Sequence, residues 1–383
     1  MRVAVIGAGP IGLAAALGAL DRGHQVTVLE AGAPGEHLRR WGTTRLFTPL
    51  GMSVPAAMLT RLSSAPPAEA LLTGPELADR VLVPLARLLG DRLRHGHRVR
   101  AVGRARLHRS ELAHHPLRAE RPFRLLVETR AGELVLEADR VLDASGVYGQ
   151  PLPMGAGGPA RGERALAGRI LRDLGAVALN SVRLANRRVL LVGHGHSAAN
   201  ALGALAELVA AHPDTRVIWA VRSSNLRPCV EVASDPLPER RMVTARANEL
   251  ASRPPAWLTV ERRAHVEAVE LTDDDALAVT LAGDRRRVVD EIVSLTGYRP
   301  DLEMLSELAL EIGPSNEGVA GLERALANVT DCLTVPAVSP RDLATGEPGF
   351  HLIGQKSYGR ARTFLLQTGY AQLESILDTL NVR

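Results

Sequence analysis

Apolar and polar positions alternate in blocks along the first thirty residues. Residues 2–6, Arg-Val-Ala-Val-Ile, form a β-branched run typical of a buried parallel strand. A glycine-rich turn follows, and an alanine- and leucine-rich stretch then continues to about Leu20 with the composition of a buried helix. Residues 25–29, Gln-Val-Thr-Val-Leu, form a second apolar run. This order predicts a strand–helix–strand unit.

The same order returns from residue 188. Residues 188–192, Arg-Val-Leu-Leu-Val, predict a strand, and residues 197–211 predict a helix that ends before Pro213. Residues 217–221, Val-Ile-Trp-Ala-Val, predict the second strand of this unit. The chain therefore contains two strand–helix–strand units.

The remaining chain has weaker patterns. Residues 71–93 have helical periodicity, interrupted by Pro84, and residues 99–107 and 124–135 predict strands of a meander. Residues 141–146 and 290–297 each predict a strand that ends in small residues, where the chain crosses between domains.

The first unit has the pattern GxGxxG at its turn. Gly7 permits the tight turn, Gly9 allows a pyrophosphate to approach the backbone, and Gly12 allows the helix to pack on the strand. Phosphates would lie at the helix N-terminus, and Glu30, after the second strand, can accept a hydrogen bond from a ribose hydroxyl. This unit is predicted to bind FAD or NAD.

The second unit has Gly193-His-Gly195-His-Ser197-Ala198 at its turn and Arg222 at the position that corresponds to Glu30. Alanine at the third glycine position still allows the helix to pack on the strand. An arginine after the second strand suits a 2′-phosphate, whereas a carboxylate suits a free 2′-hydroxyl. The second unit is therefore predicted to bind NADPH.

Together these patterns predict an α/β fold with two Rossmann-like, three-layer dinucleotide-binding domains. The NADPH-binding domain would be inserted into the FAD-binding domain. The expected ranges are 1–148 for the first part of the FAD-binding domain, 149–294 for the NADPH-binding domain and 295–383 for the second part of the FAD-binding domain.

Composition narrows the functional classes. Hydrophobic residues make up 46% and charged residues 23% of the 383 residues, which is typical of a folded globular protein. The two cysteines, Cys229 and Cys332, exclude a disulfide framework and a cysteine-based zinc cluster, and we expect no metal site. No apolar run is long enough to cross a membrane, and the N-terminus lacks the pattern of a signal peptide, so we expect a cytoplasmic protein.

The basic residues are unusual in kind. All but one of the 46 are arginine, and the single lysine is Lys356. Because the arginines are spread along the chain and only eleven aromatic residues are present, we expect no nucleic-acid partner.

The motifs in combination resemble the two-dinucleotide-binding-domain flavoproteins, which include glutathione reductase, thioredoxin reductase and the flavin-containing monooxygenases. Residues 7–30 match the FAD fingerprint of that superfamily, and residues 143–146 and 295–297 resemble its two crossovers. Residues 193–198 resemble the NADPH turn of its monooxygenase-like branch, and residues 350–354 resemble the last strand before the flavin. The nearest match is the short, CzcO-like group.

Two departures separate the chain from well-known branches. The position before Gly12, where one branch of reductases keeps a single reactive cysteine, is Ile11, and neither cysteine lies in a redox motif. The FxGxxxHxxx[FY] signature of full-length flavin-containing and Baeyer–Villiger monooxygenases is absent from residues 155–180, where it should lie.

The resemblance also implies residues around the flavin. The loop from Trp41 to Pro49 would lie along the flavin, Gln355 would take the place of an aspartate that binds the ribityl chain, and residues 362–365 would open the final helix with its N–H groups toward the flavin. Lys356 would add positive charge beside the ring. The full set of expected cofactor-binding residues is Gly7, Gly9, Pro10, Ile11, Gly12, Glu30, Ala31, Trp41, Arg45, Thr48, Val99, Ala144, Ser145, Gly146, Gly193, Gly195, His196, Ser197, Ala198, Arg222, Gly354, Gln355, Lys356, Thr363, Phe364 and Leu365.

Three functions follow as hypotheses, with no catalytic acid or base assigned. The first is an FAD-dependent, NADPH-consuming monooxygenase that uses O2 and a flavin C4a-hydroperoxide to oxidise a small nitrogen- or sulfur-containing substrate. The second is an NADPH-dependent flavin oxidoreductase without oxygen insertion, with a quinone, a thiol or a carrier protein as acceptor. The third is a flavin-binding regulatory or assembly protein.

Overall fold

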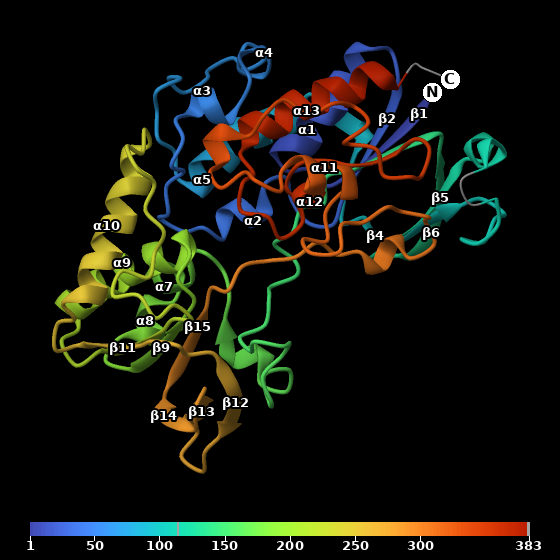
Figure 1. Ribbon diagram of the computed structural model, residues 1–383. Coiled ribbons are helices and arrows are strands. Elements are labelled where there is room, and N and C mark those ends of the chain that lie inside the picture. Colours follow the sequence, from blue (N-terminus) through green and yellow to red (C-terminus); the bar gives the residue numbers. More distant parts are fainter. Residues whose placement is uncertain (113–114, 381–383) are drawn as a thin grey trace.

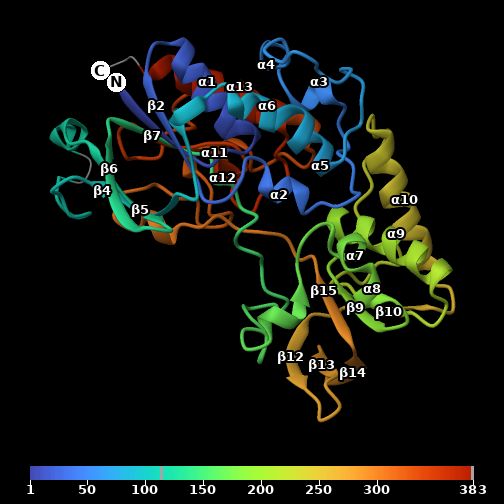
Figure 2. The same ribbon diagram turned by 180° about the vertical axis from the view of Figure 1, so that it is seen from behind.

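The computed structural model describes residues 1–112 and 115–380. The chain forms two lobes joined by two extended segments (Figure 1; Figure 2 shows the same arrangement from behind). The N-terminus and the final helix lie in one lobe, and the second strand–helix–strand unit lies in the other.

The first lobe is built on a five-stranded parallel sheet. Its spatial order is β16-β7-β1-β2-β3. The bounds are β1 Arg2–Ile6, β2 Gln25–Glu30, β3 Leu93–His95, β7 Arg140–Asp143 and β16 Phe350–Leu352. Strand β16 comes from the end of the chain and pairs with β7, in parallel. The C-terminal segment therefore completes the sheet that the N-terminus begins.

Helices and a small antiparallel sheet complete this lobe. Helices α1 (Pro10–Asp21) and α13 (Leu366–Thr379) lie against each other, because Gly18 on α1 leaves room for the Leu377 side chain. The antiparallel sheet contains β4 (Arg98–Arg104), β5 (Phe123–Thr129) and β6 (Gly132–Ala138), as the predicted meander requires. The short helices are α2 Glu36–Arg39, α3 Leu50–Ser53, α4 Ala56–Leu59, α11 Ala320–Ala325 and α12 Gln355–Tyr358.

The helical pattern over residues 71–93 is found in the structure at residues 74–87, but not at its two ends. The segment contains α5 (Gly74–Leu77), a π-helical turn at Ala78–Leu82 and α6 (Val83–Arg87), and its end is β3. The ring of Pro84 removes an N–H donor, and the wider turn just before it accommodates that loss. Thr73 begins the segment with a capping box, since its side chain and that of Glu76 bond to each other's backbone.

The second lobe has a parallel sheet of the same type. Its order is β11-β10-β9-β15-β8, with bounds β8 Ile170–Leu171, β9 Arg188–Val192, β10 Arg216–Ala220, β11 Leu258–Glu261 and β15 Glu291–Ser294. Helices α7 (Ala176–Leu179), α8 (Ser181–Leu184), α9 (His196–Ala211) and α10 (Pro238–Ser252) accompany it. The fold class expected from the sequence, α/β with Rossmann-like parallel sheets, is confirmed.

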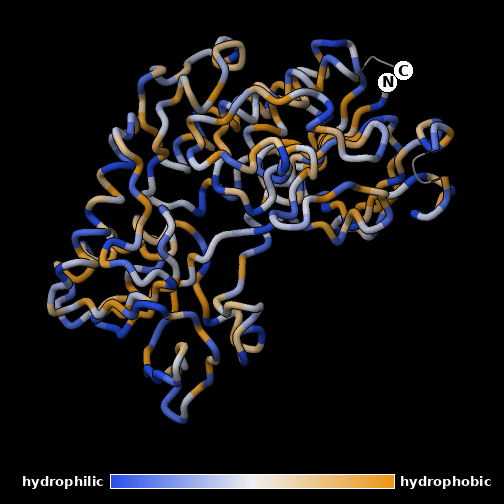
Figure 3. Tube along the Cα trace, viewed as in Figure 1, coloured by the Kyte–Doolittle hydropathy of each residue, from blue (hydrophilic) through white to orange (hydrophobic). Residues whose placement is uncertain are grey.

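Strand β9 shows how three layers arise in this lobe. Its side chains alternate between two cores: Val189 and Leu191 pack with the helices, while Leu190 and Val192 pack with an antiparallel sheet. That sheet contains β12 (Val266–Leu271), β13 (Leu277–Leu281) and β14 (Arg285–Val289). Its middle strand, β13, is buried at four of its five positions, whereas β14 begins with three consecutive arginines; Figure 3 colours the chain by hydropathy.

The two segments that join the lobes run side by side. Pro151 and Tyr298 form an antiparallel bridge, the Leu152 N–H donates to the Gly297 carbonyl (2.8 Å), and the Arg299 N–H donates to the Gln150 carbonyl (2.9 Å). The second lobe is therefore entered and left at one place. Within the described residues, no helix has the length and apolarity that crossing a bilayer requires.

Candidate cofactor site between the lobes

The first glycine-rich turn has the geometry that its sequence predicts. Gly7 has a φ of +98°, and a Cβ there would lie 2.8 Å from the Ala144 carbonyl oxygen. Gly9 caps α1, and a Cβ there would have no atom within 4 Å, so its backbone faces open space. A Cβ at Gly12 would lie 2.1 Å from the Gly7 carbonyl oxygen. Only glycine fits at Gly7 and Gly12, and the turn leaves a free surface for a ligand at Gly9.

Glu30, at the end of β2, is fixed by backbone donors. Its carboxylate accepts the Ala8 N–H (2.7 Å) and the Gly32 N–H (2.7 Å). Each oxygen retains a free lone pair, and Glu30 lines the cavity described below. It can therefore accept a hydrogen bond from a ribose hydroxyl, as the sequence predicts.

The second turn has a similar backbone. Gly193 has a φ of +117°, and a Cβ there would lie 2.3 Å from the Leu295 carbonyl oxygen. Gly195 caps α9 and, like Gly9, faces open space. Arg222 follows β10 and lines the cavity, and its side chain has no hydrogen bond or ion pair to any residue that the structure describes. Arg222 is therefore available to a phosphate.

One large cavity connects the two turns. Its volume is about 1870 Å³, and it is lined by both glycine-rich turns, both crossovers and the start of α13. Twenty-two of the expected cofactor-binding residues line it: Gly7, Gly9, Pro10, Ile11, Glu30, Ala31, Trp41, Arg45, Thr48, Val99, Ala144, Ser145, Gly146, Gly193, Gly195, His196, Ser197, Arg222, Gly354, Gln355, Phe364 and Leu365.

Four expected residues do not line the cavity. Gly12 and Ala198 lie where each helix packs on its sheet, and Ala198 is fully buried. Thr363 is buried behind the wall. Lys356 is fully buried, and its ammonium group donates to Asp143 Oδ2 (2.7 Å) and Ser145 Oγ (3.0 Å). The prediction that Lys356 lies beside the flavin ring is therefore corrected, because its charge is paired with Asp143.

The start of the final helix also differs from the prediction. Helix α13 begins at Leu366 with Leu365 as its N-cap, so residues 362–365 precede the helix. Phe364, Leu365 and Leu366 line the cavity, so the first turn of the helix, with its free N–H groups, still lies at the cavity wall. A helix N-terminus at this point favours negative charge on a bound group.

Aromatic side chains form part of the wall. Trp41 packs edge-on against Tyr148 (ring centroids 6.2 Å apart), and Tyr148 packs edge-on against Tyr298 (4.8 Å). Trp41 lines the cavity, and its indole N–H has no acceptor among the described residues. The wall thus offers flat apolar surface to a cofactor.

The two lobes also contact each other at the cavity. The Phe47 ring of the first lobe lies edge-on to the His196 ring of the second, with centroids 5.4 Å apart. Burial is the main cause that lowers the pKa of His196, so its ring is neutral at pH 7. His196 therefore contributes a packing surface and a neutral ring to the cavity.

A buried arginine makes a second contact between the lobes. Arg240 on α10 bonds to Asp235 of its own lobe (Nε–Oδ2, 2.7 Å), and across the interface to Asp331 (Nη2–Oδ2, 3.2 Å) and to Cys332 Sγ (3.1 Å). Sequence patterns could not reveal this arginine, because its partners across the interface are about ninety residues away. Both Asp331 and Cys332 line the cavity.

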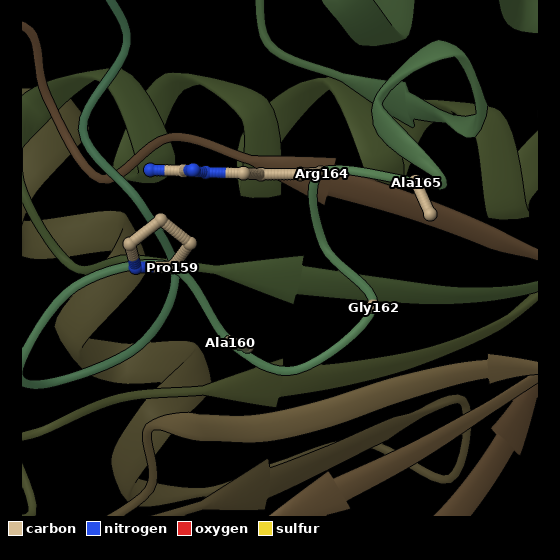
Figure 4. Close-up of a pocket in the computed structure, with 5 residues that line it drawn as sticks. All are labelled: Pro159, Ala160, Gly162, Arg164 and Ala165. Carbon is tan, nitrogen blue, oxygen red and sulfur yellow. The ribbon is translucent and has the colours of Figure 1, made fainter.

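A smaller cavity of about 420 Å³ lies in the loop after β7, beside Pro159, Gly162 and Arg164 (Figure 4). The Arg164 side chain extends past Pro159 in that view, and Arg164 also lines the large cavity. The loop is held by buried Glu163, which accepts the backbone N–H groups of Met154 (3.1 Å) and Ala160 (2.8 Å). The smaller cavity is therefore a recess next to the larger one.

Solved structures share this fold over the whole chain. The structure is similar to bacillithiol disulfide reductase from Bacillus cereus, with a TM-score of 0.68, 16% identity and 99% of each chain covered. It is also similar to ornithine hydroxylase from Pseudomonas aeruginosa, with a TM-score of 0.63, 16% identity and coverage of 99% of this chain and 98% of the other. A flavin monooxygenase from Stenotrophomonas maltophilia gives a TM-score of 0.62 at 21% identity, with 98% of each chain covered.

No curated protein matches the chain significantly in sequence. A family model does match: the pyridine nucleotide-disulphide oxidoreductase family, over residues 1–321. This range contains both glycine-rich turns and both crossovers. The single large cavity lined by both turns agrees with that match. The chain belongs to the pyridine nucleotide-disulphide oxidoreductase family, and it is a flavin-dependent oxidoreductase whose cofactors are FAD and NAD(P)H.

Proposed function

We propose that the protein is an FAD-dependent, NADPH-consuming monooxygenase that oxidises a small nitrogen- or sulfur-containing substrate with O2. The main support is the identity of Ile11. Ile11 lines the cavity at the FAD turn, and its side chain lies against Gly354 and Gly369, where an added Cβ would approach it to 3.1 Å and 3.0 Å. An apolar side chain stands where a reductase of the single-cysteine type needs a thiol, so the FAD turn itself supplies no sulfur to receive electrons.

The acidic residues of the cavity support the same proposal. Each of them bonds to a backbone N–H or to an arginine; they are Glu30, Glu36, Glu163, Asp301 and Asp331. None is left as an unengaged general base beside the cofactors. This agrees with a reaction whose difficult chemistry belongs to the cofactor.

The residues of the chain have distinct tasks in this proposal. The Gly7–Gly12 turn and Glu30 would hold FAD, and the Gly193–Ser197 turn and Arg222 would hold NADPH. When bound, the two cofactors would supply hydride transfer and the reduction of O2. Trp41 and Phe364 would exclude water from the reacting atoms, and the N-terminus of α13 would stabilise negative charge.

A stoichiometry measurement tests the proposal. NADPH, O2, hydrogen peroxide and product are measured with a panel of amines, amino acids, thiols and sulfides. At least one substrate should give one oxygenated product for each NADPH consumed, with peroxide suppressed. The proposal fails if every substrate yields only peroxide while a quinone or a disulfide is reduced rapidly.

A second candidate function is NADPH-dependent reduction of a thiol-linked or quinone acceptor without oxygen insertion. One observation favours it: Cys229 and Cys332 both line the cavity. Burial raises the pKa of Cys229 to about 11, and burial also raises the pKa of Cys332. Both are therefore thiols at neutral pH and weak nucleophiles. Under the main proposal, C332S should keep NADPH oxidation within about 2-fold; a loss of disulfide reduction of about 100-fold in C332S would favour the second candidate.

A further inference from the structure

The only lysine of the chain is buried beside the cavity wall. The side chains of Lys356 and Asp143 are each 0% exposed, and Nζ lies 2.7 Å from Asp143 Oδ2. Lys356 lies on α12, directly after the cavity residues Gly354 and Gln355. All the other basic residues of the chain are arginine, and an ammonium group is the more compact of the two cations.

Asp143 uses both of its oxygens. Oδ2 accepts from Lys356, and Oδ1 accepts the backbone N–H of Ser145 (3.0 Å). Lys356 in turn donates to Ser145 Oγ (3.0 Å). Ser145 is therefore held at two atoms, its N–H by the carboxylate and its hydroxyl by the ammonium group, and the three side chains form a closed set of hydrogen bonds.

Ser145 faces the FAD turn. It lines the cavity, and a Cβ added to Gly7 would lie 3.1 Å from Ser145 Cα. An ammonium group donates and cannot accept, so the bond from Lys356 occupies a lone pair of the hydroxyl and leaves its proton free. That proton is available to an acceptor on the side of the cavity.

We propose that Lys356 is a positioning residue for the cofactor: together with Asp143 it orients Ser145 so that the Ser145 hydroxyl donates a hydrogen bond to an oxygen of bound FAD at the Gly7 turn. This role depends on FAD binding and not on the fate of the electrons. It therefore stands or falls separately from the monooxygenase proposal.

A purely structural role for Lys356 makes a different prediction. In that case the lysine only neutralises buried Asp143, and removing both charges together should leave FAD binding unchanged. K356M alone leaves an unpaired buried carboxylate and can prevent folding. The pair K356M/D143N removes both charges at once and keeps the comparison within folded protein.

The experiment measures the Kd for FAD by titrating apoprotein and following flavin fluorescence, with the thermal midpoint of the apoprotein as a second readout. S145A should raise the Kd about 10-fold, the effect of one lost hydrogen bond to a polar ligand, with little change in the midpoint. K356M/D143N should raise it by a similar factor. Adding S145A to that pair should cost less than about 2-fold more, because the hydroxyl is already misdirected.

Thr345 provides a matched control. Its buried hydroxyl donates to the Phe350 carbonyl (2.7 Å) away from the cavity lining, so T345V should keep the Kd for FAD. An unchanged Kd in S145A overturns the proposal, and that variant tests it even if the buried pair does not fold. A native Kd in K356M/D143N, or an undiminished 10-fold effect of S145A in that background, also overturns it.

Discussion

The turns at Gly7–Gly12 and Gly193–Ala198 share their backbone geometry. Gly9 has φ −79° and ψ −175°, and Gly195 has φ −82° and ψ −177°. The residues that follow the second strand of each unit differ. Glu30 is already bonded to two backbone N–H groups, whereas Arg222 has no partner within the described chain. Under the proposed assignment, the same backbone would serve two nucleotides, and the side chain after the second strand would select the ligand.

The two turns also differ in how they are supported. A closed set of buried side chains, Asp143, Ser145 and Lys356, lies behind the first turn. Behind the second, the indole N–H of buried Trp219 donates to the Gly193 carbonyl (2.6 Å). The first turn is therefore supported by charged residues from distant parts of the chain, whereas the second is supported by one aromatic residue from the next strand.

The largest effect is expected at the third position of the first turn. In G12A the new methyl group would lie 2.1 Å from the Gly7 carbonyl oxygen, so helix and turn must separate. We expect a loss of about 2–3 kcal/mol in the free energy of unfolding, and purified protein without flavin. A198G at the corresponding position should cost only about 1 kcal/mol, through helix propensity. Urea denaturation measures the free energy of unfolding of both variants, and absorbance measures their flavin content. Equal losses of stability in G12A and A198G would show that the two turns pack alike.

Removing the acid of the first unit should produce the next largest effect. E30A takes away the acceptor of the Ala8 and Gly32 N–H groups as well as the predicted ribose contact. We expect the Kd for FAD to rise about 100-fold, and E30Q, which keeps one acceptor oxygen, to raise it about 10-fold. The KM for NADPH should not change in FAD-saturated protein. A change confined to NADPH would mean that the two units are assigned the wrong way round.

Arg222 should control the choice between NADPH and NADH. R222A is expected to raise the KM for NADPH about 10- to 50-fold while that for NADH stays within about 2-fold, because only NADPH carries the 2′-phosphate. R222K keeps the charge without the planar guanidinium group, so its KM for NADPH should lie between those of the parent protein and R222A. Steady-state kinetics with both nucleotides give the result. An equal increase in the KM values for NADPH and NADH would show that Arg222 does not contact the 2′-phosphate.

The smallest effect is expected where the two lobes meet. Burial acts to raise the pKa of Asp331, but hydrogen bonds from the Leu333 N–H and from Arg240 lower it overall. A carboxyl group with a lowered pKa stabilises the folded protein above its ordinary pKa, and this stabilisation is lost as the pH falls through the lowered value. Thermal midpoints should therefore fall between pH 5 and about pH 3, by less in D331N than in the parent protein. If the thermal midpoints of D331N and the parent protein changed in parallel with pH, the ion pair between Asp331 and Arg240 would not stabilise the contact between the lobes.

The sequence predicted what is encoded locally. Both glycine turns, Glu30 and Arg222 lie within about thirty residues of their motif, and the strands and helices between them have clear periodicity. Lys356 was placed beside the flavin ring, but its partner Asp143 is 213 residues away, so no local pattern could show that the two charges pair. The contact between Arg240 and Asp331 was missed for the same reason.

Two further differences from the sequence prediction, at Pro84 and at strand β3, have local structural causes. Pro84 suggested a broken helix, but a single π-helical turn absorbs the missing donor, and periodicity alone does not reveal such a turn. Strand β3 has only three residues, too few for an alternating pattern, and its pairing with β2 decides its conformation.

The paired segments between the lobes have a consequence for modularity. Because the Arg299 N–H bonds to the Gln150 carbonyl, the two ends of the inserted lobe are already adjacent, as in a hairpin. A two-residue turn could close that gap, so the insertion could be excised without stretching the remaining backbone. The first lobe would then be a continuous chain that carries its complete five-stranded sheet. The protein thus has the layout of one lobe interrupted by a second, with both crossings made by a single pair of antiparallel segments.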